Sequence, residues 1–124
     1  MTVVERYLIT LVVNEIDVVE GELVRTYAPI TISKLVRMLP IRSRVYKLPD
    51  RAYFQVDLKM DVEKPREQVA RGDIAFWPQA SAMALFLKDS KLTQPVSLIG
   101  KVTKGLEVVE RAPMGASIVV KLAT

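Results

Sequence analysis

The chain has 124 residues, 50% of them hydrophobic and 26% charged, which fits one ordinary folded domain rather than a disordered segment. It contains no cysteine and no histidine, which excludes disulfides, thiolate catalysis, metal sites built on these residues and a Ser-His-Asp mechanism. The formal net charge of +4 at pH 7 is a mild basic excess that does not identify a partner.

No apolar stretch approaches the roughly 20 residues that cross a bilayer. The first residues lack the basic start and apolar run of a signal peptide. We therefore expect a cytoplasmic protein that does not contact membranes. No repeat, low-complexity tract or flexible linker divides the sequence, so we expect one domain over residues 1–124.

The first third of the chain predicts a hairpin followed by a helix. Apolar and polar residues alternate from Val3 to Val13, the period of a strand with one buried face. A second strand is expected over residues 23–28. Thr31 or Ser33 can cap a helix whose apolar residues then recur at helical spacing, and Pro40 ends it.

The rest of the chain predicts mainly short strands. They are expected over residues 44–48, 52–60, 74–77, 83–88, 96–103 and 118–122. Residues 65–70 are expected to form a short turn of helix, and a second short helix is expected after Gly105, ending at Pro113. About eight strands and two helices without a βαβ rhythm predict an all-β fold, a closed eight-stranded barrel with a helix capping each opening.

Several segments resemble a known family. Residues 96–110, which read Val-Ser-Leu-Ile-Gly-Lys-Val-Thr-Lys-Gly-Leu-Glu-Val-Val-Glu, are similar to the cyclophilin segment in which a strand ending Phe-Gly-Lys-Val runs through a glycine turn into a helix. Residues 83–87 and 116–123 resemble two further cyclophilin strands. Pro-Arg-Glu at 65–67 and Gly-Asp-Ile-Ala-Phe-Trp-Pro at 72–78 are similar to a small prokaryotic group with a cyclophilin-like fold and unassigned function. The resemblance implies the fold, and a fold does not imply a function.

Cyclophilins are peptidyl-prolyl isomerases, which lower a rotation barrier of about 18–20 kcal/mol. Alignment with the arginine-bearing hairpin of that family places Lys47 at the arginine and Gln55 at the pocket glutamine. Val96 or a neighbour stands where the family has a histidine, and the family's pocket tryptophan has no counterpart. Because a flexible ammonium does not reproduce the planar guanidinium, a weak isomerase built on Lys47, Gln55 and Phe86 is an alternative rather than the preferred function.

The preferred hypothesis is a non-catalytic module that binds a small molecule or a peptide in the cyclophilin-like groove. Aromatic and methionine side chains beside two glutamines would give an apolar pocket with a few donors. The residues expected in this groove are Lys47, Gln55, Trp77, Gln79 and Phe86. Phe76, Met83 and Phe86 are alternatively core residues, whereas Trp77 is expected near a rim because Pro78 follows it. No catalytic residue, metal ligand or cofactor is expected.

Nucleic-acid binding through the basic segment 34–51 is a further alternative. Its cations are Lys34, Arg37, Arg42, Arg44, Lys47 and Arg51. Platforms for single strands need aromatic residues among the cations, and Tyr46 and Tyr53 are the only local candidates. Adjacent strand residues face opposite sides, so Tyr46 and Lys47 would not share a surface. The sequence therefore disfavours this alternative.

Overall fold

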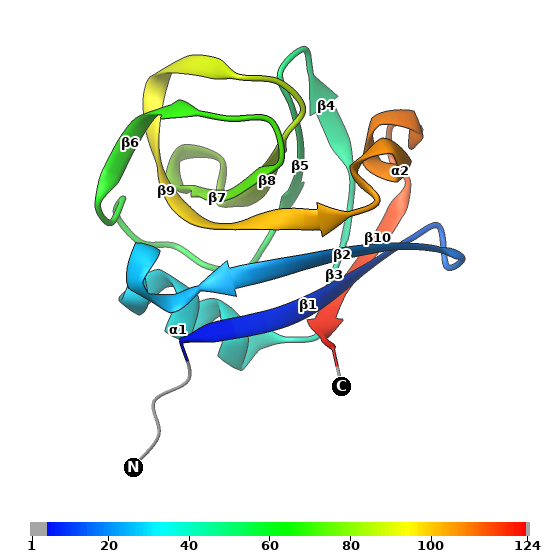
Figure 1. The fold of residues 1–124 in the computed structure, drawn as a ribbon, viewed down its shortest axis with the longest axis horizontal. Helices are drawn as coiled ribbons and strands as arrows, with labels where there is room; N and C mark the ends of the chain where they lie inside the picture. The colour runs from blue at the N-terminus through cyan, green and yellow to red at the C-terminus, as the bar shows by residue number, and fades with distance from the viewer. Residues whose placement is uncertain (1–4, 124) are drawn as a thin grey trace.

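The structure is a computed structural model that describes residues 5–123, over which ten strands form one antiparallel sheet with two α-helices (Figure 1). The strands are β1 (Arg6–Val13), β2 (Asp17–Val24), β3 (Ile41–Arg44), β4 (Tyr46–Leu48), β5 (Arg51–Gln55), β6 (Pro65–Val69), β7 (Asp73–Trp77), β8 (Ala82–Phe86), β9 (Ser90–Lys104) and β10 (Ser117–Leu122). The helices are α1 (Pro29–Met38) and α2 (Leu106–Arg111), and the short 3-10 turns are η1 (Arg25–Tyr27) and η2 (Pro78–Ala80).

The strands follow one hydrogen-bonded path, β3-β10-β1-β2-β9-β7-β8-β5-β4, with β6 paired to β9 beside it. The two ends of the path, β3 and β4, are separated in the chain by the single buried residue Val45. Over residues 5–123 no strand pairing joins β3 to β4, so hydrogen bonds do not close the sheet. The all-β class is therefore confirmed. The closed eight-stranded barrel is not confirmed, because the sheet has ten strands and an open path.

Several element boundaries differ from the sequence-based prediction. β2 begins at Asp17, and most of the segment expected to continue that strand forms η1. The strand expected over 44–48 divides at Val45 into the last residue of β3 and the whole of β4, and the strand expected over 52–60 ends at Gln55. Val3 and Val4, the start of the first predicted strand, lie outside the described residues.

The expected helical turn at 65–70 is wrong, since residues 65–69 form strand β6. Arg66, Glu67 and Gln68 are exposed and carry no apolar alternation that would indicate a strand. The strand forms because β6 pairs with the first half of β9, which itself begins at Ser90 rather than Val96. This pairing is a tertiary contact that local sequence patterns do not encode.

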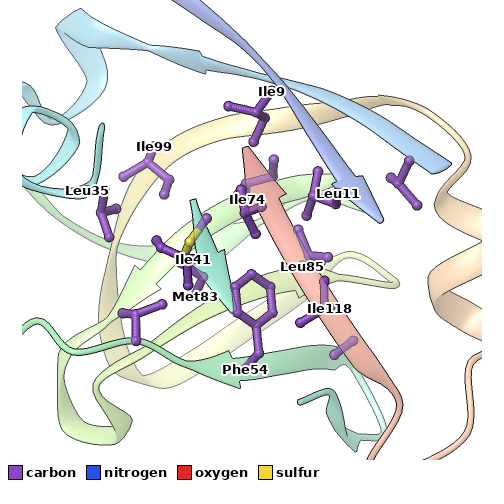
Figure 2. Close-up of a cluster of buried hydrophobic side chains, with 14 of the residues drawn as sticks. Ile9, Leu11, Leu35, Ile41, Phe54, Ile74, Met83, Leu85, Ile99 and Ile118 are labelled. Atoms are coloured by element: carbon purple, nitrogen blue, oxygen red, sulfur yellow. The ribbon is translucent and has the colours of Figure 1, made fainter. Parts of the chain in front are cut away.

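The main core lies on the inner face of the sheet, and its side chains come from distant parts of the chain (Figure 2). β1 contributes Ile9, Leu11 and Val13, as its alternation predicts. α1 contributes Ile32 and Leu35, whereas its lysine and arginine side chains are exposed. The other labelled core residues in Figure 2 are Ile41, Phe54, Ile74, Met83, Leu85, Ile99 and Ile118.

The N-terminus of α1 is capped from elsewhere in the chain, so the expected cap by Thr31 or Ser33 is wrong. The helix begins at Pro29, a position that suits proline because no N–H is needed there. The carboxylate of Glu63 accepts hydrogen bonds from the backbone N–H of Ile30 (3.2 Å) and from both the N–H (2.8 Å) and the hydroxyl (2.7 Å) of Thr31. The backbone N–H of Glu63 in turn donates to Ser97 of β9.

These contacts set the protonation of Glu63. Partial burial raises the pKa of the Glu63 carboxyl, but the hydrogen bonds from Thr31 and Ile30 outweigh it and leave that pKa below the ordinary 4.5. A negative charge at this position also complements the partial positive charge of a helix N-terminus.

β2 and β9 leave no room for a side chain at Gly100. This glycine is opposite Leu23 of β2 on one side and Ile74 of β7 on the other. A methyl group on Gly100 would overlap the carbonyl oxygen of Glu22 and come within 2.9 Å of the Leu23 Cα. Because both obstacles are backbone, no side chain can move to relieve the clash.

We therefore expect Gly100→Ala to destabilise the fold by about 4 kcal/mol or more, which is in the exceptional range for one substitution. Gly115→Ala is the control, since Gly115 has a positive φ of 83° but no heavy atom within 4 Å of the added methyl. Its expected cost is about 1–2 kcal/mol from backbone strain alone. Urea unfolding checks both values, and equal losses would contradict the steric argument.

Glu63→Ala should lower the free energy of unfolding at neutral pH by about 1–2 kcal/mol, the usual worth of a helix cap. Because the pKa of Glu63 is lowered in the folded state, its stabilisation is fully present above pH 4.5 and is lost as the pH falls through the folded pKa. The wild type and the variant should therefore converge in stability below pH 4.5. Glu67→Ala, on exposed β6, should show neither the loss nor the convergence.

Candidate functional site

The candidate site lies on the outer face of strands β5, β8 and β7. Ala82 of β8 is opposite Gln55 of β5 and also opposite Trp77 of β7. Residues directly opposite each other in antiparallel strands share a face, so Gln55 and Trp77 flank Ala82 on the same surface. Phe86 lies on this face too, four residues farther along β8.

Aromatic rings form a continuous row across this face. The ring centroids of Tyr46 and Tyr53 are 6.1 Å apart, and those of Tyr53 and Trp77 are 5.5 Å apart in an edge-to-face arrangement. The Trp77 indole N–H donates to the side-chain oxygen of Gln94 on β9. Trp77 is half-buried, which agrees with its expected place near a rim.

Arg51 fills the space between the aromatic rings. Its guanidinium carbon lies 4.6 Å from the centre of the Trp77 ring and 5.1 Å from that of Phe86. Its side chain is only 12% exposed, and it makes two hydrogen bonds to the carboxylate of Asp50, at 2.9 and 3.1 Å. The hydrogen bonds from Arg51 lower the pKa of Asp50 despite partial burial, so the pair stays ionised at neutral pH.

A second apolar cluster lies between the outer face of β7 and β8 and the strands that cover it. It consists of Val69, Ala75, Ala84, Phe86, Leu92 and Val96. β6 and the first half of β9 supply its cover, and Figure 1 shows β9 curling around β7 and β8 before it crosses to β2. The three alanines on this face, at 75, 82 and 84, leave room for the larger side chains above them.

The five residues expected in the groove do not gather in one hollow. Phe86 is fully buried beneath Arg51, and Phe76 and Met83 are also buried. All three are therefore core residues, which is the alternative that the sequence analysis gave for them. Gln79 lines a separate hollow beside Met60.

Lys47 faces the opposite side of β4 from Tyr46, and its ammonium donates to the backbone oxygen of Glu110 in α2. The Glu110 carboxylate also accepts two hydrogen bonds from Arg71, which lower its pKa. Lys47 therefore helps to hold α2 in place. Of the five residues expected in the groove, only Gln55 and Trp77 lie on the accessible surface of this outer face.

An open hollow adjoins the row of rings at the seam where the sheet is not closed. Its volume is about 410 Å³, and it is lined by Arg42, Ser43, Arg44, Tyr46 and Gln55. Sites for small ligands typically measure about 300–1,000 Å³ and combine apolar walls with a few polar groups. Two guanidiniums, a phenol and an amide at one hollow can bind an anionic or strongly polar group beside an aromatic surface.

Sequence reasoning placed Gln55 and Trp77 in the groove, but it considered Arg51 and Tyr53 only for the nucleic-acid alternative. The sequence did contain a signal for this arrangement. Arg51, Tyr53 and Gln55 occupy every second position of β5, so their side chains must share a face. Arg42 and Arg44 precede Tyr46 closely in the chain, but the break between β3 and β4 at Val45, which leaves an open hollow beside them, was not predicted.

Both the sequence and the structure of the chain are similar to those of known proteins. The sequence model of the cyclophilin-like family matches residues 8–121. The chain belongs to the cyclophilin-like family. Its structure is similar to the solution structure of a hypothetical protein from Archaeoglobus fulgidus, with 28% sequence identity over 96% of each chain and a TM-score of 0.76. No curated protein matches the chain.

None of the helices in the described part of this cyclophilin-like chain is long and apolar enough to cross a membrane. Among residues 5–123, no three acidic side chains gather closely enough to hold a metal ion.

Arg51→Ala tests the packing of the site through the only tryptophan of the chain. Removal of the guanidinium should expose the Trp77 indole, shift its emission to longer wavelength and cost about 1–2 kcal/mol of stability through the lost cation–π contacts. Arg66→Ala, on exposed β6, is the control and should leave the emission unchanged. An unchanged spectrum in Arg51→Ala would show that Arg51 does not cover the ring.

Proposed function

We propose that this cyclophilin-like protein is a non-catalytic module that binds a small molecule or an extended peptide at the hollow beside Tyr46 and Gln55. The observation that carries the proposal is the position of this hollow. It lies against the one continuous row of aromatic side chains in the described structure.

The lining favours a ligand with a negatively charged group. Arg42 and Arg44 are exposed, and no carboxylate lines the hollow. One N–H of Arg44 donates to the backbone oxygen of Gly115, which orients the guanidinium and leaves its other donors for a ligand. The Gln55 amide and the Tyr46 hydroxyl add donors and acceptors for a peptide group, and the rings of Tyr46 and Tyr53 offer an apolar surface.

The isomerase alternative has less support. Lys47, the residue aligned with the arginine of cyclophilins, is bonded to α2 and lies on the other face of β4 from Tyr46. Phe86 is buried. The Arg51 guanidinium is held by Asp50 and packs against the Trp77 ring. We therefore expect no acceleration of proline isomerisation in a protease-coupled peptide assay.

Nucleic-acid binding gains one supporting observation. Arg42 and Arg44 share a hollow with Tyr46, so two cations of the basic segment do lie beside an aromatic ring. The remaining cations are dispersed, since Lys34 and Arg37 are on α1 and Lys47 is engaged by α2. A groove that follows a nucleic-acid backbone needs a longer basic track, so a compact ligand is favoured.

The test is a titration followed by amide chemical shifts and Trp77 fluorescence. The probes are a set of acidic and proline-containing pentapeptides and a library of carboxylated metabolites. We expect at least one probe to shift the amides of β3, β4 and Gln55, and Gln55→Ala or Arg42→Gln to weaken that probe about tenfold, as loss of one charge-assisted hydrogen bond does.

Gln79→Ala is the matched control, because Gln79 lines a different hollow and is likewise exposed. It should bind the probe as the wild type does. If no probe shifts these amides, or if Gln79→Ala weakens binding as much as Gln55→Ala, the proposed site is wrong. Tight binding of single-stranded oligonucleotides that falls steeply with salt would favour the nucleic-acid alternative instead.

A further inference from the structure

A second hollow lies at the edge of the sheet, where β10 extends beyond β3. β3 begins opposite Val120, so within residues 5–123 no strand pairs with Lys121 and Leu122 on that side. The turn that joins α1 to β3, at Leu39 and Pro40, lines the hollow there instead. The volume of the hollow is about 440 Å³, which lies in the usual range of sites for small ligands.

The walls of this hollow are aliphatic. Val12 and Val119 lie opposite each other on the outer face of β1 and β10. Leu122 has a position on the inner face of the sheet, but it lies at the end of β10 and its side chain is 41% exposed. The hollow therefore continues from the outer face around the unpaired end of β10 to Leu122.

Two cationic side chains line the hollow, and no carboxylate does. Arg42 is opposite Val119, and Lys121 is two residues farther along β10, so the two cations are diagonal neighbours on the same face. The Cβ atoms of such neighbours are about 7 Å apart. Both side chains are exposed, and neither makes an ion pair within residues 5–123. One carboxylate can therefore accept hydrogen bonds from both cations.

We propose that this hollow binds a carboxylate that carries an alkyl chain of medium length. The carboxylate lies between Arg42 and Lys121, and the chain lies along Val119 and around the end of β10 to Leu122. An alkyl chain is favoured over an aromatic ring, because none of the lining residues is aromatic and because a flexible chain can follow the bend of the hollow. This site is separate from the hollow beside Tyr46, although Arg42 lines both.

The open position of the hollow sets a modest affinity. Octanoate has about ten non-hydrogen atoms, and we expect a dissociation constant on the order of 0.1–1 mM for it. Each methylene that leaves water should tighten binding by about two- to fourfold. Butanoate, which is four methylenes shorter, should therefore bind at least about tenfold more weakly than octanoate.

The first test is a titration of the full chain with octanoate, butanoate and octan-1-ol, followed by amide chemical shifts. We expect octanoate to shift the amides of Leu39, Arg42 and residues 119–122. Octan-1-ol should bind about tenfold more weakly, because it offers no charge to the two cations.

Three results of this titration would overturn the proposal. The first is an absence of shifts at these amides up to about 5 mM octanoate, which is above the expected constant. The second is binding of octan-1-ol as tight as that of octanoate. The third is a set of octanoate shifts centred on Tyr46 and Gln55, which would place the ligand in the other hollow.

The second test uses two variants with matched controls. Lys121→Gln should weaken octanoate about tenfold, whereas Lys88→Gln makes the same change at an exposed position outside the hollow and should not. Val119→Thr places a hydroxyl in the apolar wall and should weaken octanoate about threefold or more. Its control is Val18→Thr, on the same face but outside the hollow.

Circular dichroism should show all four variants folded. If Lys121→Gln binds octanoate no more weakly than Lys88→Gln, the cation has no role in the site and the proposal is wrong. Equal binding by Val119→Thr and Val18→Thr would likewise contradict the position given to the alkyl chain.

Discussion

The close approach of β2 and β9 at Gly100 determines the arrangement of the rest of the molecule. β9 is the only strand of the described sheet that pairs with three others, β2, β7 and β6. Gly100 lies where it is held between Leu23 of β2 and Ile74 of β7, with no space for a side chain. The register of β9 shifts just before Gly100 against β7, and between Val102 and Lys104 against β2. Such irregularities bend and twist a strand.

Because of this bend, the two halves of β9 lie against different parts of the molecule. The second half completes the inner sheet over the main core. The first half, with β6, lies over the outer face of β7 and β8 and buries Phe86 beneath the row of aromatic rings. One half of the outer surface is thus covered by the chain itself, and the hollow of the proposed ligand site lies at its margin. The other half is not covered in this way within the described structure.

Much of this fold could be predicted from the sequence. The alternation in β1, the helical spacing in α1 and the segment around Gly105 carried enough local signal to place those elements, and the resemblance of residues 96–110 indicated the correct family. Strand β6 could not be predicted, because its three central residues are exposed and polar and it depends on pairing with β9. The cap of α1 escaped prediction for the same reason, since Glu63 lies 32 residues from Thr31 in the chain.

The candidate site, like the fold, could be predicted from the sequence only in part. Gln55 and Trp77 were predicted, and Arg51 and Tyr53 follow from strand periodicity once β5 is placed. In the hollow, Arg42, Arg44 and Tyr46 are close because β3 and β4 are consecutive in the chain, whereas Gln55 reaches it on β5, which pairs with β4. Lys47 was expected in the groove from an alignment, but the side of the strand on which a residue lies depends on register. The structure places Lys47 against α2.

The nuclear Overhauser contact between the α protons of Gly100 and Leu23 is the most direct measurement of this arrangement. The account predicts a strong contact, together with slow amide exchange along β2 and the second half of β9, since those amides are paired within the sheet. Absence of that contact, with amides of β2 exchanging as quickly as those of an exposed edge strand, would contradict the role assigned to Gly100 and the division of the surface that follows from it.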